Sequence, residues 1–242
     1  MSKLSFVILA AGKGVRMRSP VPKPLIKISG KSMLERVVES ARRVPAERII
    51  AVTGGGDVEQ EARRLGCINA LQKEALGTGD ALKKALPGCF PEGEVLVSCA
   101  DIPLIPPEVF RKIYNKNREE GTYMTVLTAR APDPSGYGRV ITENGRVRKI
   151  VEEKEASEAE KGVDLVNSGV YCIKRSGLEK FLDEIGKSPV KGEYYLTDLP
   201  EVVIKNGLTV RGMSCPWELV QGVNTPGQLR KAGEVLEEKK EG

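Results

Sequence analysis

The sequence contains no histidine among its 242 residues. Histidine is the side chain whose ordinary pKa lies closest to neutral pH, and it is the usual general base in enzymes. Its absence excludes catalysis through Ser-His-Asp or Cys-His arrangements and the usual zinc chemistry. A reaction on this chain must therefore use carboxylates, lysines, arginines, backbone amides or a hard metal ion.

Cysteines and long apolar runs are also scarce. The five cysteines are odd in number and form no C-x-x-C pair, which argues against a disulfide framework and a zinc cluster. No apolar run approaches the roughly 18 residues of a membrane helix, and the N-terminal apolar stretch runs into Gly12 without a signal-peptide cleavage site. We therefore expect a cytoplasmic protein with no membrane partner.

The charge balance is only mildly basic, with a formal net charge of +5. Long basic runs with interleaved aromatic residues are missing, which argues against a nucleic-acid partner. A small anionic substrate suits this charge. With 40% hydrophobic residues and no internal repeat, the chain can form one well-packed core. We expect a single domain over residues 1–228, followed by a C-terminal helix and charged tail over residues 229–242.

Apolar strand-like runs alternate with helical periods along the first half of the chain. The strands are expected at 6–9, 48–52, 95–98, 124–127 and 166–173, and the helices at 33–43, 58–65, 79–86 and 107–120. Such alternation predicts βαβ units and a largely parallel sheet that is buried on both faces. The fold class is therefore α/β: a Rossmann-like, open, mixed and mostly parallel sheet with helices on both faces.

The second half of the chain has a different pattern. Runs at 139–142 and 146–151 flank Asn144-Gly145, which is a strong hairpin signal. We interpret this region as an antiparallel insertion on the parallel sheet, followed by a charged flap or short helix at 152–163. A last helix is expected at about 226–239.

The loop after the first strand combines glycines with well-spaced cations. It reads Leu9-Ala10-Ala11-Gly12-Lys13-Gly14-Val15-Arg16-Met17, and Lys23 follows seven residues after Arg16. Glycines let backbone N–H groups approach an anion, and Arg16 and Lys23 add a planar fork and a point charge for phosphate oxygens. The third glycine of a dinucleotide fingerprint is missing, and the Gly30-Lys31-Ser32 tail of a P-loop lacks its first glycine. The loop therefore predicts a phosphate site of another kind.

This loop resembles the signature of the sugar-nucleotide nucleotidyltransferases. The likeness is closest to the N-terminal pyrophosphorylase domains of bifunctional N-acetylglucosamine-1-phosphate uridyltransferases/acetyltransferases. It recurs in order along nearly the whole chain, at 71–79, 100–105, 136–139, 150–154, 166–171, 192–198 and 222–225. Each motif is common alone, whereas seven in sequence order are highly specific.

The resemblance implies Mg²⁺-dependent transfer of a uridylyl group from UTP to N-acetylglucosamine 1-phosphate, with release of pyrophosphate. The sugar phosphate is already an anion and needs no general base, so catalysis reduces to positioning and charge neutralisation. That agrees with a histidine-free chain. The expected partners are these two small substrates, and the expected assembly is a monomer or weak homodimer.

The resemblance also implies roles for individual residues. Arg16 and Lys23 would be catalytic, and Asp101 and Asn224 would hold the metal ion. Asp101 follows a buried strand, where open α/β sheets bind ligands. The nucleotide would contact Leu9, Ala10, Ala11, Gly12, Gly14, Gln72, Gly77 and Thr78, with Gln72 facing the uracil edge. The sugar would contact Gly138, Glu152, Asn167 and Thr197.

The sequence departs from the family's pattern at a few positions. Ala100 stands where glycine usually precedes the metal aspartate, and its methyl group puts the sugar's identity in question. Asp80 replaces the usual histidine, and we expect no consequence for the chemistry. The resemblance ends before any acetyltransferase repeat, so acetyl transfer is not expected. The alternatives are a related nucleotidyltransferase for another sugar 1-phosphate such as glucose 1-phosphate, or for dTTP, and a catalytically silent sugar-nucleotide binding protein.

Overall fold

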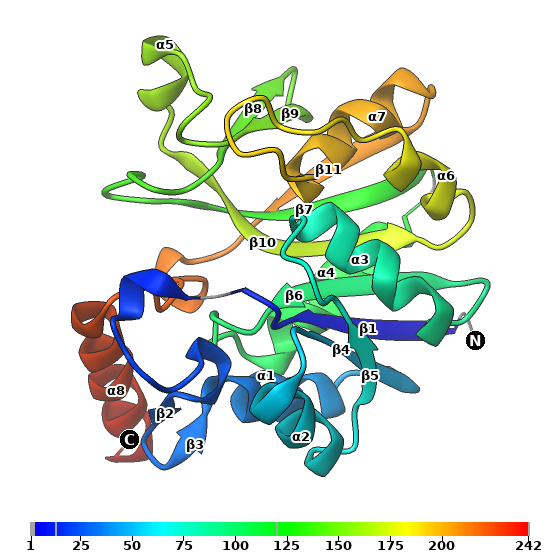
Figure 1. Cartoon of the computed structure of the whole chain (residues 1–242). Coiled ribbons are helices and arrows are strands. Elements are labelled where there is room, and N and C mark those ends of the chain that lie inside the picture. The colour runs from blue at the N-terminus through cyan, green and yellow to red at the C-terminus, as the bar shows by residue number, and fades with distance from the viewer. Residues whose placement is uncertain (1–2, 13, 120, 242) are drawn as a thin grey trace.

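A nine-stranded sheet runs through the middle of the molecule in the computed structural model, which describes residues 3–12, 14–119 and 121–241 (Figure 1). Lys13 of the glycine loop lies outside the described residues. The main path of the sheet has the order β11-β7-β10-β6-β1-β4-β5. Its strands are β1 (Leu4–Leu9), β4 (Arg48–Thr53), β5 (Ile68–Leu71), β6 (Glu94–Cys99), β7 (Thr122–Arg130), β10 (Leu165–Lys174) and β11 (Thr209–Ser214).

The direction of the strands confirms a mixed, mostly parallel sheet. β1 pairs in parallel with β4 and β6, β4 with β5, and β7 with β11. β10 pairs antiparallel with both β6 and β7, so the other strands of the path all point one way. Their carboxyl ends therefore meet at one edge of the sheet, where ligands bind in open α/β folds.

Helices cover both faces of the sheet because the central strands are apolar on both sides. Along β1, Leu4, Phe6 and Ile8 pack into the cluster of one face, and Val7 packs into the other. The first face carries α1 (Met33–Arg42), α2 (Gly56–Arg64) and α4 (Pro107–Asn117). The second carries α3 (Thr78–Ala85), α6 (Leu178–Asp183) and α7 (Leu199–Lys205).

The predicted hairpin is present as β8 (Arg139–Glu143) and β9 (Arg146–Val151). Asn144 and Gly145 both have positive φ, 50° and 74°, which is the backbone that an Asn-Gly hairpin turn requires. The charged segment that follows contains the short helix α5 (Glu158–Lys161), closed by a capping box. Figure 1 shows the hairpin and α5 at the opposite end of the molecule from β2 (Lys27–Ile28), β3 (Lys31–Ser32) and the C-terminal helix.

Several elements differ from the sequence-based expectation. β5, β11, α6 and α7 were not predicted, and β7 spans 122–130 where 124–127 was expected. The C-terminal helix, α8 (Pro226–Glu241), begins where it was predicted. Its Ala232 packs with Ile28, Leu104 and Val223, so the helix lies against the body of the protein. Short 3₁₀ helices occupy Val15–Met17, Lys23–Leu25, Leu86–Gly88, Leu196–Asp198 and Trp217–Leu219.

Among the described residues, the helices are all too short or too polar to cross a bilayer.

Candidate active site

The candidate site lies at the carboxyl edge of the sheet, where β1 and β6 run side by side. After β1 the chain continues to β4, which lies on one side of β1, and after β5 it returns to β6, which lies on the other side of β1. Loops after β1 and β6 therefore diverge, which makes this a topological switch point. Ala100 donates its N–H to the carbonyl of Leu9 at 3.0 Å, so the glycine loop and the segment leading to Asp101 start from adjacent positions.

Gly14 shapes the glycine loop. Its φ of 60° is left-handed, and a Cβ at this position would lie 2.4 Å from the Cβ of Lys23. Glycine is therefore required both by the backbone and by the close approach of the Lys23 stem. The turn at Gly14 starts the short helix that carries Arg16, and the aliphatic part of Lys23 packs against Gly14.

Four of the predicted site residues form one connected polar cluster. The ammonium group of Lys23 donates to Oδ2 of Asp101, and to Oδ1 of Asn224 at 2.7 Å. Arg16 donates to the same Asn224 oxygen at 2.9 Å. These residues come from the loops after β1, β6 and β11, and the cluster carries two positive charges against one negative charge. Such a surplus of positive charge favours a phosphate-bearing ligand.

Asn224 is held in place by contacts on both sides. The N–H of Val223 donates to the carbonyl of Asp101 at 2.8 Å, which ties the two loops together. The N–H of Asn224 donates to the side chain of Gln228 in α8 at 2.8 Å. The hydroxyl of Tyr137 accepts from the N–H of Gly222 at 3.2 Å, which joins this loop to the segment before β8.

The donor set of Asp101 and Asn224 suits a hard divalent cation. One Lys23 ammonium contacts both side-chain oxygens, so the two oxygens can reach a single positive centre. Mg²⁺ is usually bound by one or two protein oxygens, with phosphate oxygens and water completing its shell. Within the described part of the chain, no three His, Cys, Asp or Glu side chains are grouped as metal ligands. An ion held by Asp101 and Asn224 would have room in its shell for phosphate oxygens of a ligand and for water.

The three residues expected to face the base also lie together. Gln72 directly follows β5, is buried, and donates through Nε2 to the carbonyl of Gly77 at 2.9 Å. Gly77 has a φ of 105°, and a Cβ there would lie 2.3 Å from the carbonyl oxygen of Tyr194. The hydroxyl of Thr78 accepts from the N–H of Leu196 at 2.9 Å. The loop before α3 is thereby fixed to the segment 194–196.

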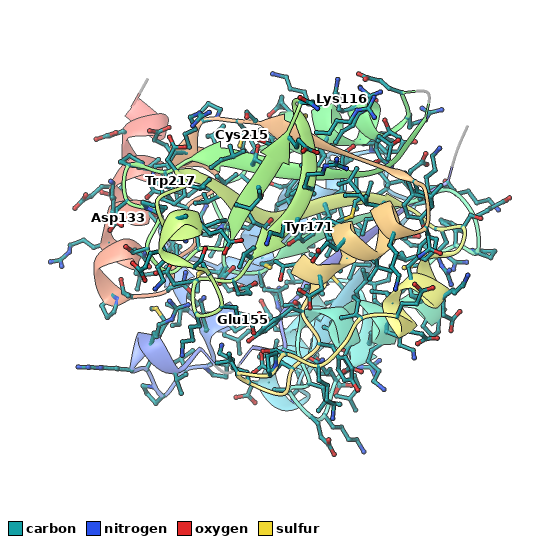
Figure 2. The ribbon with its side chains drawn as sticks, turned by 90° about the horizontal axis from the view of Figure 1, so that it is seen from above. Lys116, Asp133, Glu155, Tyr171, Cys215 and Trp217 are labelled. Atoms are coloured by element: carbon teal, nitrogen blue, oxygen red, sulfur yellow. The ribbon has the colours of Figure 1, made fainter. Side chains whose placement is uncertain are left out.

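The four residues expected to face the sugar are paired. The N–H of Asn167 donates to the carbonyl of Gly138 at 2.9 Å, and Thr197 donates to a carboxylate oxygen of Glu152 at 2.9 Å. The Asn167 amide also donates to the hydroxyl of Tyr171 at 2.6 Å. Tyr171 lies near the middle of the molecule, 3% exposed (Figure 2). These contacts place the four residues where β8, β9 and β10 meet the loop before α7.

Burial changes the acidity of Cys99, which precedes the Asp101 segment, and of Glu152, which was predicted to face the sugar. Burial raises the pKa of the Cys99 thiol to about 12, and the charge of Asp101 adds to the effect. Cys99 is therefore a neutral thiol at physiological pH and is unsuited to act as a nucleophile. Burial also raises the pKa of Glu152, although its hydrogen bond from Thr197 acts in the opposite direction.

Sequence reasoning missed three residues that support the site. Tyr137 and Gln228 hold the loop of Asn224, and Arg139, 2% exposed, pairs with Glu153 at 2.6 Å. Arg139 also donates to the carbonyls of Tyr137 and Lys161. Tyr137 and Arg139 belong to the recurring motif at 136–139, but only a buried environment distinguishes them from surface residues.

Ala100, the residue that replaces the usual glycine, is 3% exposed and belongs to the hydrophobic cluster under α1 and α4. Its methyl group therefore packs into the core.

Sequence comparison gives a family match that covers most of the chain. Residues 6–162 match the MobA-like NTP transferase domain. The bifunctional protein GlmU of Lactobacillus johnsonii is 41% identical over 96% of this chain and 51% of its own length. GlmU of Pelotomaculum thermopropionicum is 42% identical over 96% of this chain and 52% of its own length. The chain thus spans about half the length of these curated relatives.

Comparison with solved structures places the fold. An inositol-1-phosphate CTP transferase from T. maritima matches with a TM-score of 0.77 and 20% identity, over 100% of this chain and 98% of that chain. A CMP:2-keto-3-deoxy-manno-octonic acid synthetase complexed with CTP matches with a TM-score of 0.72 and 21% identity, over 98% of this chain and 100% of that chain. At such low identity these matches establish a shared architecture.

Proposed function

Because the chain belongs to the MobA-like NTP transferase family and is a nucleotidyltransferase, we propose that it transfers the uridylyl group of UTP to N-acetylglucosamine 1-phosphate. The products are UDP-N-acetylglucosamine and pyrophosphate. The similarity to the GlmU proteins over 96% of this chain supports the choice of substrates.

One observation carries the proposal: Arg16, Lys23, Asp101 and Asn224 form a single hydrogen-bonded cluster. The cluster joins three distant parts of the sequence, and Arg16 and Asn224 are 208 positions apart. A protein that only binds a sugar nucleotide has no need to aim two cations and a pair of metal-type oxygens at the same point.

The chemistry requires little from the protein beyond position and charge. An oxygen of the sugar phosphate forms a bond to the α-phosphorus of UTP, and the bond from that phosphorus to the bridging oxygen of pyrophosphate breaks. No proton has to be removed from the nucleophile, since it is already an anion. Lys23 and Arg16 offset the negative charge on the phosphates, and backbone N–H groups of the glycine loop hold the triphosphate.

Asp101 and Asn224 are the residues that would hold Mg²⁺. When bound, the ion would offset charge on the departing pyrophosphate. Lys23 contacts both residues, so its ammonium group lies where it can move between their oxygens and a phosphate. Its side chain is only 11% exposed, and partial exclusion of water strengthens its attraction to a phosphate.

A substrate panel tests the proposal. Purified protein is incubated with each combination of UTP, dTTP and CTP with N-acetylglucosamine 1-phosphate and glucose 1-phosphate, with and without MgCl₂, and pyrophosphate release is measured. We expect the highest kcat/KM for UTP with N-acetylglucosamine 1-phosphate, and no turnover without a divalent ion.

The other outcomes of the panel are equally clear. A preference for glucose 1-phosphate or dTTP would keep the reaction type and replace the substrate. If no combination releases pyrophosphate, calorimetry with UDP-N-acetylglucosamine follows, and tight binding would favour a sugar-nucleotide binding protein and overturn the proposal.

A further inference from the structure

The side-chain amide of Gln72 is fixed by two acceptors of the protein. Its Nε2 donates to the carbonyl of Gly77 at 2.9 Å and to Oδ2 of Asp80 at 2.8 Å. An amide NH₂ group has two hydrogens, so both are used. Gln72 is 5% exposed, and among the described residues no donor is bonded to its Oε1.

The chemistry of these partners determines which way the amide points. A backbone carbonyl and an ionised carboxylate can only accept hydrogen bonds. Rotating the amide by 180° would place Oε1 against two other acceptors, so the flipped orientation is strongly disfavoured. The bond to the Asp80 carboxylate is charge-assisted and is therefore the stronger of the two. Gln72 consequently presents only an acceptor, Oε1, to a ligand.

Because Gln72 offers only an acceptor, it discriminates among nucleotide bases that bind beside it. The placement of the base at Gln72 rests on the proposed function. In a uridine nucleotide the ring has one N–H donor, N3–H, because N1 carries the ribose. Thymine has the same edge. Cytosine has an unprotonated N3, which is an acceptor and would face the acceptor Oε1, and its donor on this edge, the N4 amino group, is attached to the neighbouring ring atom. A buried acceptor left without a donor costs binding free energy.

We propose that Asp80 is a positioning residue that fixes Gln72 as an acceptor, so that the nucleotide site favours bases with an N3–H donor over cytosine. Asp80 lies in the first turn of α3, two residues after Thr78 of the base-facing group. The sequence alone predicted no chemical consequence for aspartate at this position. Through its contact with Gln72, the aspartate that replaces the usual histidine would influence which base the site prefers.

The test compares the affinities of UTP and CTP in the wild type and in Asp80→Asn. Dissociation constants are measured by calorimetry with MgCl₂ and without sugar phosphate, so that no turnover is needed. An asparagine at position 80 can turn its NH₂ toward Gln72, and its uncharged oxygen accepts more weakly. We expect the preference for UTP over CTP to fall about fivefold to tenfold in the variant, as the loss of one oriented hydrogen bond implies.

Two further variants separate positioning from general damage to the protein. Lys84→Gln removes the cation that lies 4.0 Å from the other oxygen of Asp80, and it should leave the preference unchanged. In a Gln72→Ala background, Asp80→Asn should no longer alter the preference, since the two residues act through one contact. A merely structural role of Asp80 would weaken UTP and CTP binding by the same factor.

The inference is overturned if the wild type binds UTP and CTP equally, or if Asp80→Asn keeps the wild-type preference within twofold. It is also overturned if Asp80→Asn changes the preference equally in the Gln72→Ala background. Failure of the proposed function looks different: the wild type would bind UTP in preference to CTP but release no pyrophosphate with any sugar phosphate of the panel.

Discussion

Gly14 and Lys23 lie so close together that a Cβ atom on Gly14 would be 2.4 Å from the Cβ of Lys23. Real Cβ atoms do not approach this closely, so any side chain at position 14 must displace Lys23 or the loop. Lys23 bonds both Asp101 and Asn224. The packing of one glycine therefore controls the position of the ammonium group that we assign to the phosphates.

This contact predicts the effect of Gly14→Ala. We expect kcat/KM for pyrophosphate release to fall at least tenfold, because Lys23 moves away from Asp101 and Asn224. A side chain at φ near 60° also costs about 1 kcal/mol of folding free energy. Gly30→Ala is the matched control, since Gly30 has a φ of 85° and open space around a Cβ. It should lower the melting temperature similarly and leave kcat/KM unchanged; equal activity losses in both variants would contradict the prediction.

The pair of Asp101 and Asn224 gives a second prediction. Asp101→Asn keeps the shape of the side chain but removes the charge that attracts a divalent ion. We expect kcat to fall about 100-fold, the size seen when a charge-stabilising group is lost, with only a small change in UTP affinity. The activity should also need a higher MgCl₂ concentration. Asp57→Asn, at an exposed position in α2, serves as the control and should keep wild-type kinetics. Unchanged kcat in Asp101→Asn would remove the metal assignment.

Much of the fold and the candidate site follows from local sequence patterns. The strands before the glycine loop and before Asp101 are continuous apolar runs with clear boundaries, and the Asn144-Gly145 turn marks its hairpin directly. β5 was missed because only four residues form the strand, and its two large apolar residues, Ile68 and Leu71, are exposed at the sheet edge. β11 was missed since its pattern, Thr-Val-Arg-Gly-Met-Ser, contains a glycine and few apolar residues.

The supporting residues could not be predicted because their roles depend on distant contacts. Arg139 resembles any strand arginine until the fold buries it against Glu153 and the carbonyls of residues 137 and 161. Asp80 is likewise an ordinary acidic residue in the first turn of a helix until β5 brings Gln72 beside it. Gln72 and Asp80 are eight positions apart in the sequence, and only the structure shows that their side chains are hydrogen-bonded.

The half-buried Asp198 predicts a pH-dependent stability. Burial, aided by the charges of Glu155, Glu152 and Glu201, raises its pKa from 3.8 to about 6. Between pH 3.8 and about pH 6 the folded protein keeps a proton on Asp198 that the unfolded chain has already lost. The contribution of Asp198 to the free energy of unfolding therefore falls as the pH rises. Asp198→Asn should therefore be more stable than the wild type at pH 7, by about 1 kcal/mol because the side chain is partly exposed. The difference should shrink strongly by pH 4 and vanish below pH 3.8 in urea denaturation. A difference that is equal at both pH values would contradict the assignment.

The buried Arg139 gives the last prediction, which separates stability from chemistry. Arg139→Met leaves the carbonyls of Tyr137 and Lys161 without their donor and Glu153 without its cation. Arg139 is buried but the Glu153 side chain is 33% exposed, so removing the arginine should cost about 2 kcal/mol, whereas the exposed pair of Arg130 and Asp164 should contribute less than about 1 kcal/mol. Urea denaturation of Arg139→Met and Arg130→Met measures this difference.

Because Arg139 also fixes the backbone on both sides of Gly138, KM for the sugar phosphate should rise more than KM for UTP. Adding Glu153→Gln to Arg139→Met should recover part of the stability, since the neutral side chain no longer needs a cation. The KM for the sugar phosphate should stay high, because the backbone of residues 137–138 is still unsupported.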